Sequence, residues 1–265
     1  MGNETTFETA FPISPALKRR LHALAHKYET SQFLMGDPST FMHRYSDARD
    51  IEIVALIGAV LAFGRRDAIL SHIEHVLASI GNESPAEWIL AGMYSDAFPD
   101  CGKSFYRIFS FRNMHFFFDS LRMILLEHQS LGQCLEREYK NGKCQCQPGR
   151  LAAVLADHFP ACCSPLISQG KNSASKRLNL FLRWMVRTGS PVDLGLWTWY
   201  PPTELIMPLD IHVMQTAIRF KLLPSTARPD LKTAIRLTEI MKTVFPDDPL
   251  KGDFALFGYG VDSVE

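Results

Sequence analysis

One segment of the chain carries basic side chains and no acidic ones. Between Ser164 and Val192 the charged residues are Lys171, Lys176, Arg177, Arg183 and Arg187. At 100° per residue, Lys176, Arg183 and Arg187 fall within about 40° of one another on an α-helix and form one basic stripe. Clustered lysine and arginine release counterions from nucleic acid, so the stripe predicts a helix that faces phosphates. The alternative is a basic face that is simply exposed to solvent.

A second candidate is the stretch Pro208-Leu-Asp-Ile-His212. An aspartate directly before a helix is commonly an N-cap that accepts backbone N–H groups, which gives Asp210 a purely structural interpretation. Its other interpretation is an active-site carboxylate. His212 is expected to be packed or to support a neighbouring side chain, because no second histidine stands at metal-ligand spacing.

The third candidate is an aromatic cluster, Trp197, Trp199 and Tyr200, within a loop predicted over residues 188–209. Loops this long in a compact domain are usually functional or mobile. The aromatic side chains could anchor the loop to the core, or they could form a wall on which a flat heterocycle stacks. The sequence alone does not separate these interpretations.

The cysteines do not predict a metal site. Cys144 and Cys146 are separated by one residue, and Cys162 and Cys163 are adjacent, whereas zinc sites pair cysteines across two to four residues. Six cysteines in 265 residues are also too few for a disulfide framework, which favours a reducing cytoplasm. Because glycine-rich phosphate loops and serine-nucleophile motifs are missing from the sequence too, no cofactor is predicted.

The elements that must position these residues are predicted to be helices. Capping residues and apolar periodicity indicate helices over residues 14–29, 51–63, 67–80, 84–92, 114–128, 150–158, 173–187, 211–220, 229–245 and 249–260. Asp50 and Asp67 are the expected N-caps of the second and third. No run of alternating strands with hairpin turns is found, so the predicted fold class is all-α.

The composition is that of a globular protein. Apolar residues make up 46% and charged residues 21%, and 28 basic residues balance 28 acidic ones. This excludes wholesale disorder and a polybasic coat, so any site for a polyanion must be a local patch. The most apolar run, residues 51–63, is too short for a membrane span and contains Glu52, which predicts a buried helix. The N-terminus lacks a secretory signal pattern, so a cytoplasmic protein without membrane contact is expected.

Taken together, these stretches resemble the helix-hairpin-helix DNA glycosylase superfamily, which includes endonuclease III. The likeness runs in the family's order over about residues 50 to 260 and is carried by residues 52–67, residues 105–127, Lys176–Leu182, Pro208–His212 with Arg219-Phe220, and residues 254–258. It implies a two-lobed helical fold with a helix-hairpin-helix element at the cleft. Residues 46–265 would form this domain, with a middle lobe of about 68–190, and residues 1–45 would be a helical segment packed on it.

The chain departs from the family in four places. The hairpin reads Gly170-Lys-Asn-Ser-Ala-Ser175, with fewer glycines than usual, and no cysteine follows position 163, so the iron–sulfur cluster of the endonuclease III branch is missing. Lys176 and Asp210 are 34 residues apart, a spacing similar to the archaeal 8-oxoguanine glycosylase branch. The position that relatives insert into the duplex is Gly64, so Arg65 or Arg66 would have to act as the wedge.

The resemblance implies a repair glycosylase that acts on double-stranded DNA with a damaged base, such as an oxidised purine, and that also cleaves the strand through a lysine Schiff base. Lys176 would be the nucleophile and Asp210 the catalytic carboxylate. The residues expected to hold DNA phosphates are Lys171, Asn172, Ser173, Arg177, Arg183 and Arg187. Those expected around the base are Trp197, Trp199, Tyr200, Pro208 and His212. The protein is expected to act as a monomer.

Two other interpretations remain open. One is a catalytically inactive helical protein that binds nucleic acid or serves as a scaffold, and the other is a related N-glycosidic enzyme acting on RNA or nucleotides. The chain is also similar to a bacterial family known only as a domain of unknown function, a likeness that implies no activity. An enzyme requires the Lys176 amine and the Asp210 carboxylate to converge on one open, positively lined cleft. In a scaffold, Lys176 could be salt-bridged away, or residues 197–200 could fill the cleft.

Overall fold

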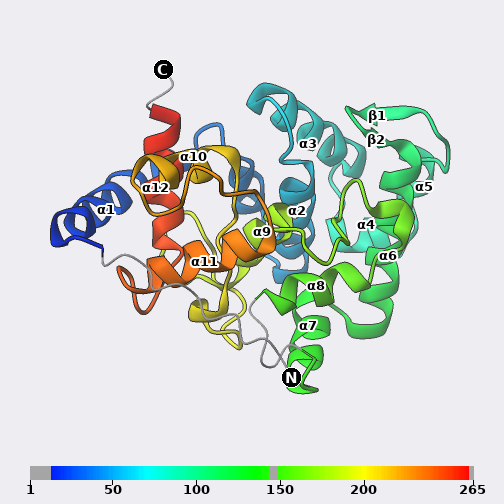
Figure 1. Cartoon of the computed structure of the whole chain (residues 1–265). Coiled ribbons are helices and arrows are strands. Elements are labelled where there is room, and N and C mark those ends of the chain that lie inside the picture. The colour runs from blue at the N-terminus through cyan, green and yellow to red at the C-terminus, as the bar shows by residue number, and fades with distance from the viewer. Residues whose placement is uncertain (1–12, 144–148, 263–265) are drawn as a thin grey trace, which may run out of the picture.

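The computed structural model describes residues 13–143 and 149–262. Across these residues the chain is built from helices, and the predicted all-α class is confirmed (Figure 1). The strands in the described part are β1 (Ser104–Tyr106) and β2 (Phe109–Ser110), an antiparallel hairpin closed by a turn at residues 107–108. None of the described helices has the length and apolar character needed to cross a membrane.

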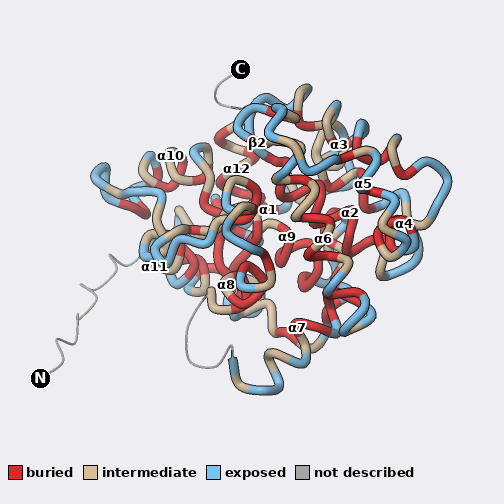
Figure 2. The backbone as a smooth tube through the Cα atoms, turned by 90° about the vertical axis from the view of Figure 1, so that its right-hand side faces the viewer, coloured by how far each residue is buried: buried red, intermediate tan, exposed pale blue. Residues whose placement is uncertain are grey.

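The larger hydrophobic core surrounds α2 (Ala48–Leu61), which is buried from Asp50 to Leu61. A helix that is apolar on all sides must be enclosed by others, and Figure 2 shows the buried backbone at the centre of the molecule. The elements that supply or flank this core are the 3₁₀ helices η2 (Pro38–Arg44) and η3 (Ala161–Cys163) and the helices α3 (Arg66–Ile80), α4 (Pro85–Leu90), α5 (Tyr94–Ala97), α6 (Phe111–His128), α7 (Leu131–Lys140), α8 (Arg150–Asp157) and α9 (Lys176–Val186).

A second hydrophobic core lies on the other side of α9 (Figure 1). Its helices are α1 (Pro15–Tyr28), α10 (Ile211–Arg219), α11 (Leu231–Lys242) and α12 (Lys251–Asp262). Helix α12 packs against both α1 and α10. The remaining 3₁₀ helices are η1 (Ser31–Leu34) and η4 (Pro202–Glu204). The second core takes in Ala174 and Leu209, whereas Leu178 belongs to the first, so the cores meet where α9 begins.

The N-cap of α2 is Asp47, not Asp50 as predicted. Helix α2 begins three residues earlier than expected, which places Asp50 inside its first turn. There Asp50 Oδ1 accepts the Ser84 hydroxyl at 2.6 Å and the Ala86 N–H at 2.9 Å, so it supports the start of α4. A carboxylate can thus cap a helix that is remote in the sequence, which local pattern does not reveal.

Three further helices differ from the prediction. Helix α6 begins at Phe111, because Ser110 and Asn113 form a capping box. Helix α7 was not predicted, although the Ser130 side chain accepts the Gln133 N–H at 3.1 Å, a typical N-cap arrangement. The predicted helix over residues 173–187 is shorter, because α9 begins only at Lys176.

Candidate functional site

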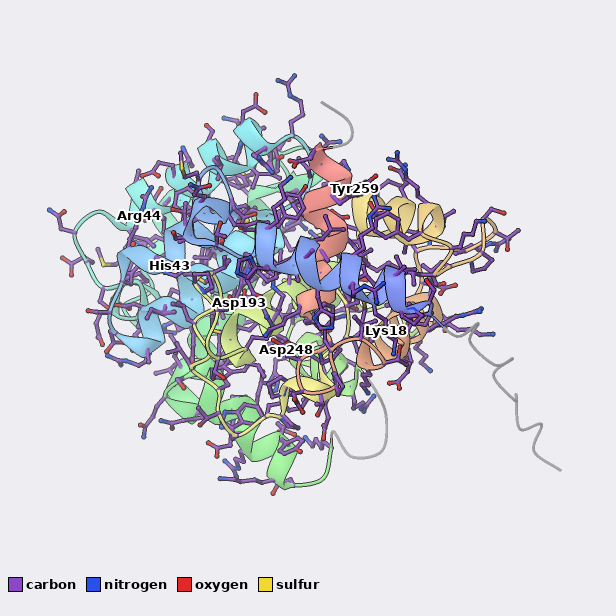
Figure 3. All side chains as sticks on the ribbon, turned by 90° about the vertical axis from the view of Figure 1, so that its left-hand side faces the viewer. Lys18, His43, Arg44, Asp193, Asp248 and Tyr259 are labelled. Carbon is purple, nitrogen blue, oxygen red and sulfur yellow. The ribbon has the colours of Figure 1, made fainter. Side chains whose placement is uncertain are left out.

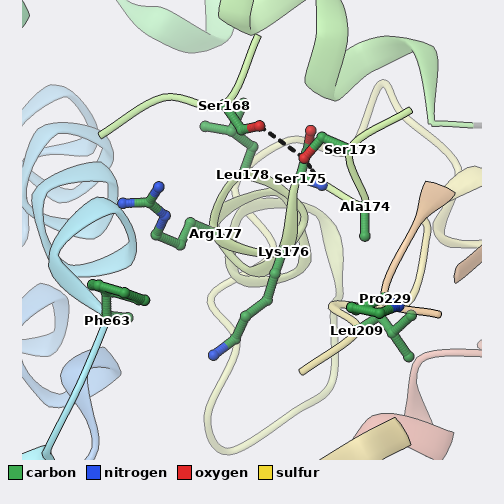
Figure 4. Close-up of a pocket in the computed structure, with 11 residues that line it drawn as sticks. Phe63, Ser168, Ser173, Ala174, Ser175, Lys176, Arg177, Leu178, Leu209 and Pro229 are labelled. Atoms are coloured by element: carbon green, nitrogen blue, oxygen red, sulfur yellow. Dashed lines mark hydrogen bonds between the residues drawn. The ribbon is translucent and has the colours of Figure 1, made fainter. Parts of the chain in front are cut away.

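Lys176 is the first residue of α9 and lies at the junction of the two cores. The residue before it, Ser175, has φ 41° and ψ 44°, a left-handed conformation that is unusual for a residue other than glycine. Its N–H donates to Ser173 Oγ at 3.1 Å, and the Ser168 hydroxyl donates to the same oxygen at 2.7 Å (Figure 4). These bonds hold the tight turn that projects Lys176 outward, with 36% of its side chain exposed.

Asp210 is the N-cap of α10, and its side chain serves two partners. One oxygen, Oδ1, accepts the Val213 N–H at 2.9 Å, which is the capping role that the sequence allows. The other, Oδ2, lies 3.4 Å from Lys176 Nζ, and 10% of the side chain is exposed. The positive end of the helix dipole stabilises a carboxylate at this place. The Lys176 amine and the Asp210 carboxylate therefore converge. Asp210 can cap α10 at the same time, because the two contacts use different carboxylate oxygens.

Lys176 lines a pocket of about 280 Å³ (Figure 4). This volume lies just below the range of ordinary ligand pockets, about 300–1,000 Å³, which suits a small group better than a large cofactor. The pocket combines apolar side chains, hydroxyls and cations. Its lining residues are Ala62, Phe63, Ser168, Ser173, Ala174, Ser175, Lys176, Arg177, Leu178, Leu209 and Pro229.

Phe63 is a pocket residue that sequence reasoning missed. It follows α2 and was counted as the end of a buried run, yet it is 41% exposed. The Tyr106 hydroxyl donates to its carbonyl at 2.7 Å, and the Arg107 guanidinium carbon lies 4.9 Å from its ring centroid. Next to it, Gly64 has φ 118°, and a Cβ there would lie 2.8 Å from the Tyr106 hydroxyl. The β1–β2 hairpin is thus fixed against the rim of the pocket.

The two predicted wedge residues stand at the start of α3, just after this rim, and Arg65, not Asp67 as predicted, is the N-cap of this helix. Arg65 and Arg66 are both exposed. Arg65 pairs with Asp67 at 2.9 Å, a surface ion pair that contributes little stability and can be exchanged for another anion. Both side chains are therefore accessible to a ligand, together with the exposed Arg107.

The prediction that Arg183 and Arg187 contact DNA phosphates is wrong. Their side chains are 2% and 1% exposed and lie in a buried ionic network. Arg183 pairs with Asp253 and, at 3.2 Å, with Asp193. Arg187 also pairs with Asp193, and its further carboxylate partners at 2.7 Å are Glu29 and Asp248. The basic stripe of α9 therefore points into the protein beyond its first turn, and these two arginines stabilise the fold.

Arg177 lines the pocket, but its guanidinium donates hydrogen bonds to backbone carbonyls. It donates to the carbonyls of Val60 at 2.9 Å and Pro165 at 2.7 Å. Burial lowers the pKa of Arg177 to about 10, so the side chain remains a cation at neutral pH. Arg177 thus joins α9 to the end of α2 and adds positive charge beside the pocket.

The predicted hairpin lies before α9 but lacks a first α-helix, because a three-residue 3₁₀ turn, η3, stands there. Lys171 and Asn172 are exposed, and Ser173 lines the pocket. The Asn172 carbonyl accepts the Leu231 N–H at 3.0 Å, and Ser173 forms a β-bridge with Asp230. The hairpin is therefore tied to the start of α11.

None of the five residues expected around the base lines this pocket, which corrects the prediction. Trp197 is 2% exposed and its Nε1–H donates to Glu52 Oε1 at 2.8 Å, while Trp199 stacks on it with ring centroids 5.6 Å apart. Tyr200 is buried as well, and Pro208 lies within the core. The aromatic side chains anchor the long loop, so the structural interpretation is the correct one. Burial raises the pKa of Glu52, the carboxylate that receives this loop.

His212 is half-buried on α10, two residues after Asp210, and its ring lies 5.9 Å from that of Phe257. Its Nδ1 is buried without a hydrogen-bond partner among the described residues. Cys144 and Cys146 lie outside the described residues. Over residues 13–143 and 149–262, no three histidine, cysteine or acidic side chains gather closely enough to hold a metal ion.

The fold and site define an all-α protein with a lysine–aspartate pair at a small, positively lined pocket. The chain belongs to the family described as protein of unknown function (DUF2400), whose model matches residues 37–262. A comparison with curated proteins gave no match, and a comparison with solved structures gave none either.

Proposed function

We propose that the protein is a DNA base-excision glycosylase with strand-cleaving activity, in which Lys176 is the nucleophile and Asp210 the assisting carboxylate. One observation carries the proposal: two side chains 34 residues apart in the sequence meet at 3.4 Å beside a pocket for a small planar group. A nucleophilic amine needs a nearby group to take its proton, and the Asp210 carboxylate contacts the amine directly. The resemblance to helix-hairpin-helix glycosylases supports the same roles.

The proposed reaction begins at the sugar carbon that carries the base. The Lys176 nitrogen bonds to this carbon while the glycosidic bond breaks. The electron pair of the broken bond leaves with the base, which takes up a proton. Positive charge develops on the sugar, and the Asp210 carboxylate stabilises it, as carboxylates do in glycoside hydrolysis. Loss of a proton from the nitrogen and opening of the sugar ring give the Schiff base. Loss of a proton from C2′ of that intermediate forms a C2′–C3′ double bond, and the C3′–O bond breaks with its electron pair leaving on the 3′ phosphate, which cuts the strand.

The rim of the pocket supplies what an everted nucleotide needs. A base leaves the stack only if something replaces it and something holds the flanking phosphates. Phe63 presents an apolar ring at the rim, and we assign it the wedge role together with Arg65 or Arg66. Arg107 and Lys171 are exposed cations beside the rim and the hairpin and would contact phosphates without reading sequence. The pocket volume suits a single base, and an oxidised purine is the first lesion to test.

Borohydride trapping tests the proposal, because it reduces a lysine Schiff base to a stable covalent link. We expect the wild type to be trapped on duplex DNA with an abasic site or an oxidised purine, and Lys176→Ala to lose the adduct. Lys140→Ala is the matched control, since Lys140 pairs with Glu136 at 2.7 Å on α7, away from the pocket. Trapping that persists in Lys176→Ala removes Lys176 from the mechanism.

Asp210 needs a separate test because it is also an N-cap. We expect Asp210→Asn, which keeps a capping oxygen, to lose most turnover while its melting temperature changes little. The alternative is a binding or scaffold protein, for which the Lys176–Asp210 ion pair and the cap are structural contacts only. Intact turnover with a large fall in melting temperature would favour that alternative.

A further inference from the structure

A second basic surface lies away from the pocket, on α1 and the end of α10. The segment from Ser14 to Tyr28 contains four lysines and arginines and no acid. Its apolar side, with Leu21 and Ala25, packs toward α12, so the polar side faces solvent. Figure 3 views this side of the molecule, with α1 across the front. The overall charge is zero, so this basic character is local.

Two arginines of this surface, Arg20 and Arg219, lie over aromatic rings. The Arg20 guanidinium carbon lies 4.6 Å from the Phe220 ring centroid and 5.1 Å from that of Tyr259. Arg219, from the last turn of α10, lies 5.3 Å from the same Tyr259 ring. We call the exposed side chains of Arg19, Arg20, Arg219 and Lys221 the basic face. Within the described part of the chain, none of these four forms an ion pair.

The acids on the neighbouring elements are engaged elsewhere. Asp262 pairs with Lys27 at 2.9 Å, Glu29 points to Arg187, and Asp253 is buried against Arg183. Glu239 pairs with Lys242 at 2.6 Å. An extended anion approaching the basic face would therefore meet four cations and little repulsion, while a cationic or apolar partner would gain nothing there.

Helix α10 connects the basic face to the pocket. Asp210 caps its first turn and Arg219 ends it, and its nine residues span about 13 Å. Along duplex DNA that distance corresponds to about four base pairs. A duplex with one nucleotide at the pocket would therefore have phosphates within reach of α1. Arg19 and Arg20 on α1 lie outside residues 37–262, which the family model matches, whereas Arg219 and Lys221 lie within them.

We propose that the basic face is a second contact surface for the phosphate backbone of duplex DNA, which grips the flank of the duplex whose central nucleotide occupies the pocket. The inference rests on the proposed DNA substrate but not on the chemistry of Lys176. The face would add affinity without sequence preference, because cations that meet phosphates carry no base information.

The test measures DNA affinity by fluorescence anisotropy on the full chain, with a duplex of about 24 base pairs that carries a stable abasic analogue at its centre. The variant is Arg19→Gln with Lys221→Gln, which leaves the arginines stacked on Tyr259 and Phe220 in place. The matched control is Arg137→Gln with Lys140→Gln on α7, which makes the same charge change away from the pocket and from the basic face. A Schiff base cannot form on the analogue, so catalysis does not enter the result.

Each lost phosphate contact lowers the slope of log affinity against log salt by about 0.9. We expect the variant's slope to fall by about two, so that the wild type loses about tenfold more affinity than the variant between roughly 50 and 200 mM salt. The control should keep the wild-type slope.

Variant and control slopes that agree on the long duplex would overturn the proposal. So would a variant that loses binding to anionic phospholipid vesicles but keeps its affinity for DNA. The trapping experiment tests the glycosylase proposal separately. If the wild type is trapped but the variant keeps the wild-type salt slope, the basic-face proposal is wrong and the glycosylase proposal stands. If the variant's slope is reduced but the wild type is not trapped, the glycosylase proposal is wrong and the basic-face proposal stands.

Discussion

Asp193 is the centre of the buried ionic network, and its removal should destabilise the protein strongly. Its carboxylate is 0% exposed and pairs with both Arg183 and Arg187, whose side chains are 2% and 1% exposed. In Asp193→Ala, Arg183 keeps Asp253, and Arg187 keeps its other two carboxylates. Two buried cations each lose a partner, and water cannot replace it.

The expected cost is about 3–5 kcal/mol, the range for removing one partner of a buried ion pair. This is a large part of an ordinary stability of about 5–15 kcal/mol. For a chain of this size it corresponds to a fall in melting temperature of about 6–20 °C. Urea unfolding followed by circular dichroism gives the free energy of unfolding, and a thermal scan gives the melting temperature.

The control for Asp193 is Glu136→Ala, which breaks the exposed pair with Lys140 and should change the free energy of unfolding by less than about 0.5 kcal/mol. If Asp193→Ala costs no more than this control, the network does not stabilise the fold. A variant such as Arg187→Ala that weakens DNA binding while its melting temperature is unchanged would restore the phosphate-binding role and refute our reasoning.

Two further changes test the rim of the pocket and one half-buried histidine. Gly64→Ala would place a Cβ 2.8 Å from the Tyr106 hydroxyl in a backbone with φ 118°, so we expect the free energy of urea unfolding to fall by about 1–3 kcal/mol. The control Gly102→Ala, with no atom within 4 Å of its Cβ, should be neutral. Equal effects of the two substitutions would contradict this account. Burial lowers the pKa of His158 below its ordinary 6.5, so the unfolded chain binds the proton first. Its contribution to stability is therefore present above about pH 6.5 and lost as the pH falls, and the stability difference between wild type and His158→Gln should shrink between about pH 7 and 5; parallel pH curves would contradict this.

The helices could be predicted because their signals are local. Ser14 and Pro15 mark the start of α1, Ser84 caps α4, and Gly81 ends α3, as each capping pattern indicates. The meeting of Lys176 with Asp210 was expected only because their motifs appear in the order of a known superfamily. Spacing alone does not bring two side chains together across 34 residues.

The direction of the basic stripe could not be predicted from α9 itself. A helical wheel groups Arg183 and Arg187 on one face, but it does not say whether that face meets solvent or protein. Asp253, the partner of Arg183, and Glu29 and Asp248, the partners of Arg187, stand far away in the sequence, and local pattern does not connect them to α9. The base-pocket prediction for the aromatic loop failed for the same reason, since Trp197 and its anchoring partner Glu52 are 145 residues apart in the sequence. Charge pairs between residues far apart in the chain cannot be predicted from local sequence pattern.

The two ends of α9 explain why its basic residues were wrongly predicted to contact DNA, and why the helix is still suited to carry a catalytic side chain. Its first turn leaves the protein body at the strained Ser175 and presents Lys176 at the pocket. Seven residues later, about 10 Å along the axis, Arg183 enters the buried network that holds the helix to α12 and to the long loop. A side chain can act on a bound group only if its backbone is held in place, so the arginines that were expected to grip DNA would serve catalysis by fixing the helix that carries the amine.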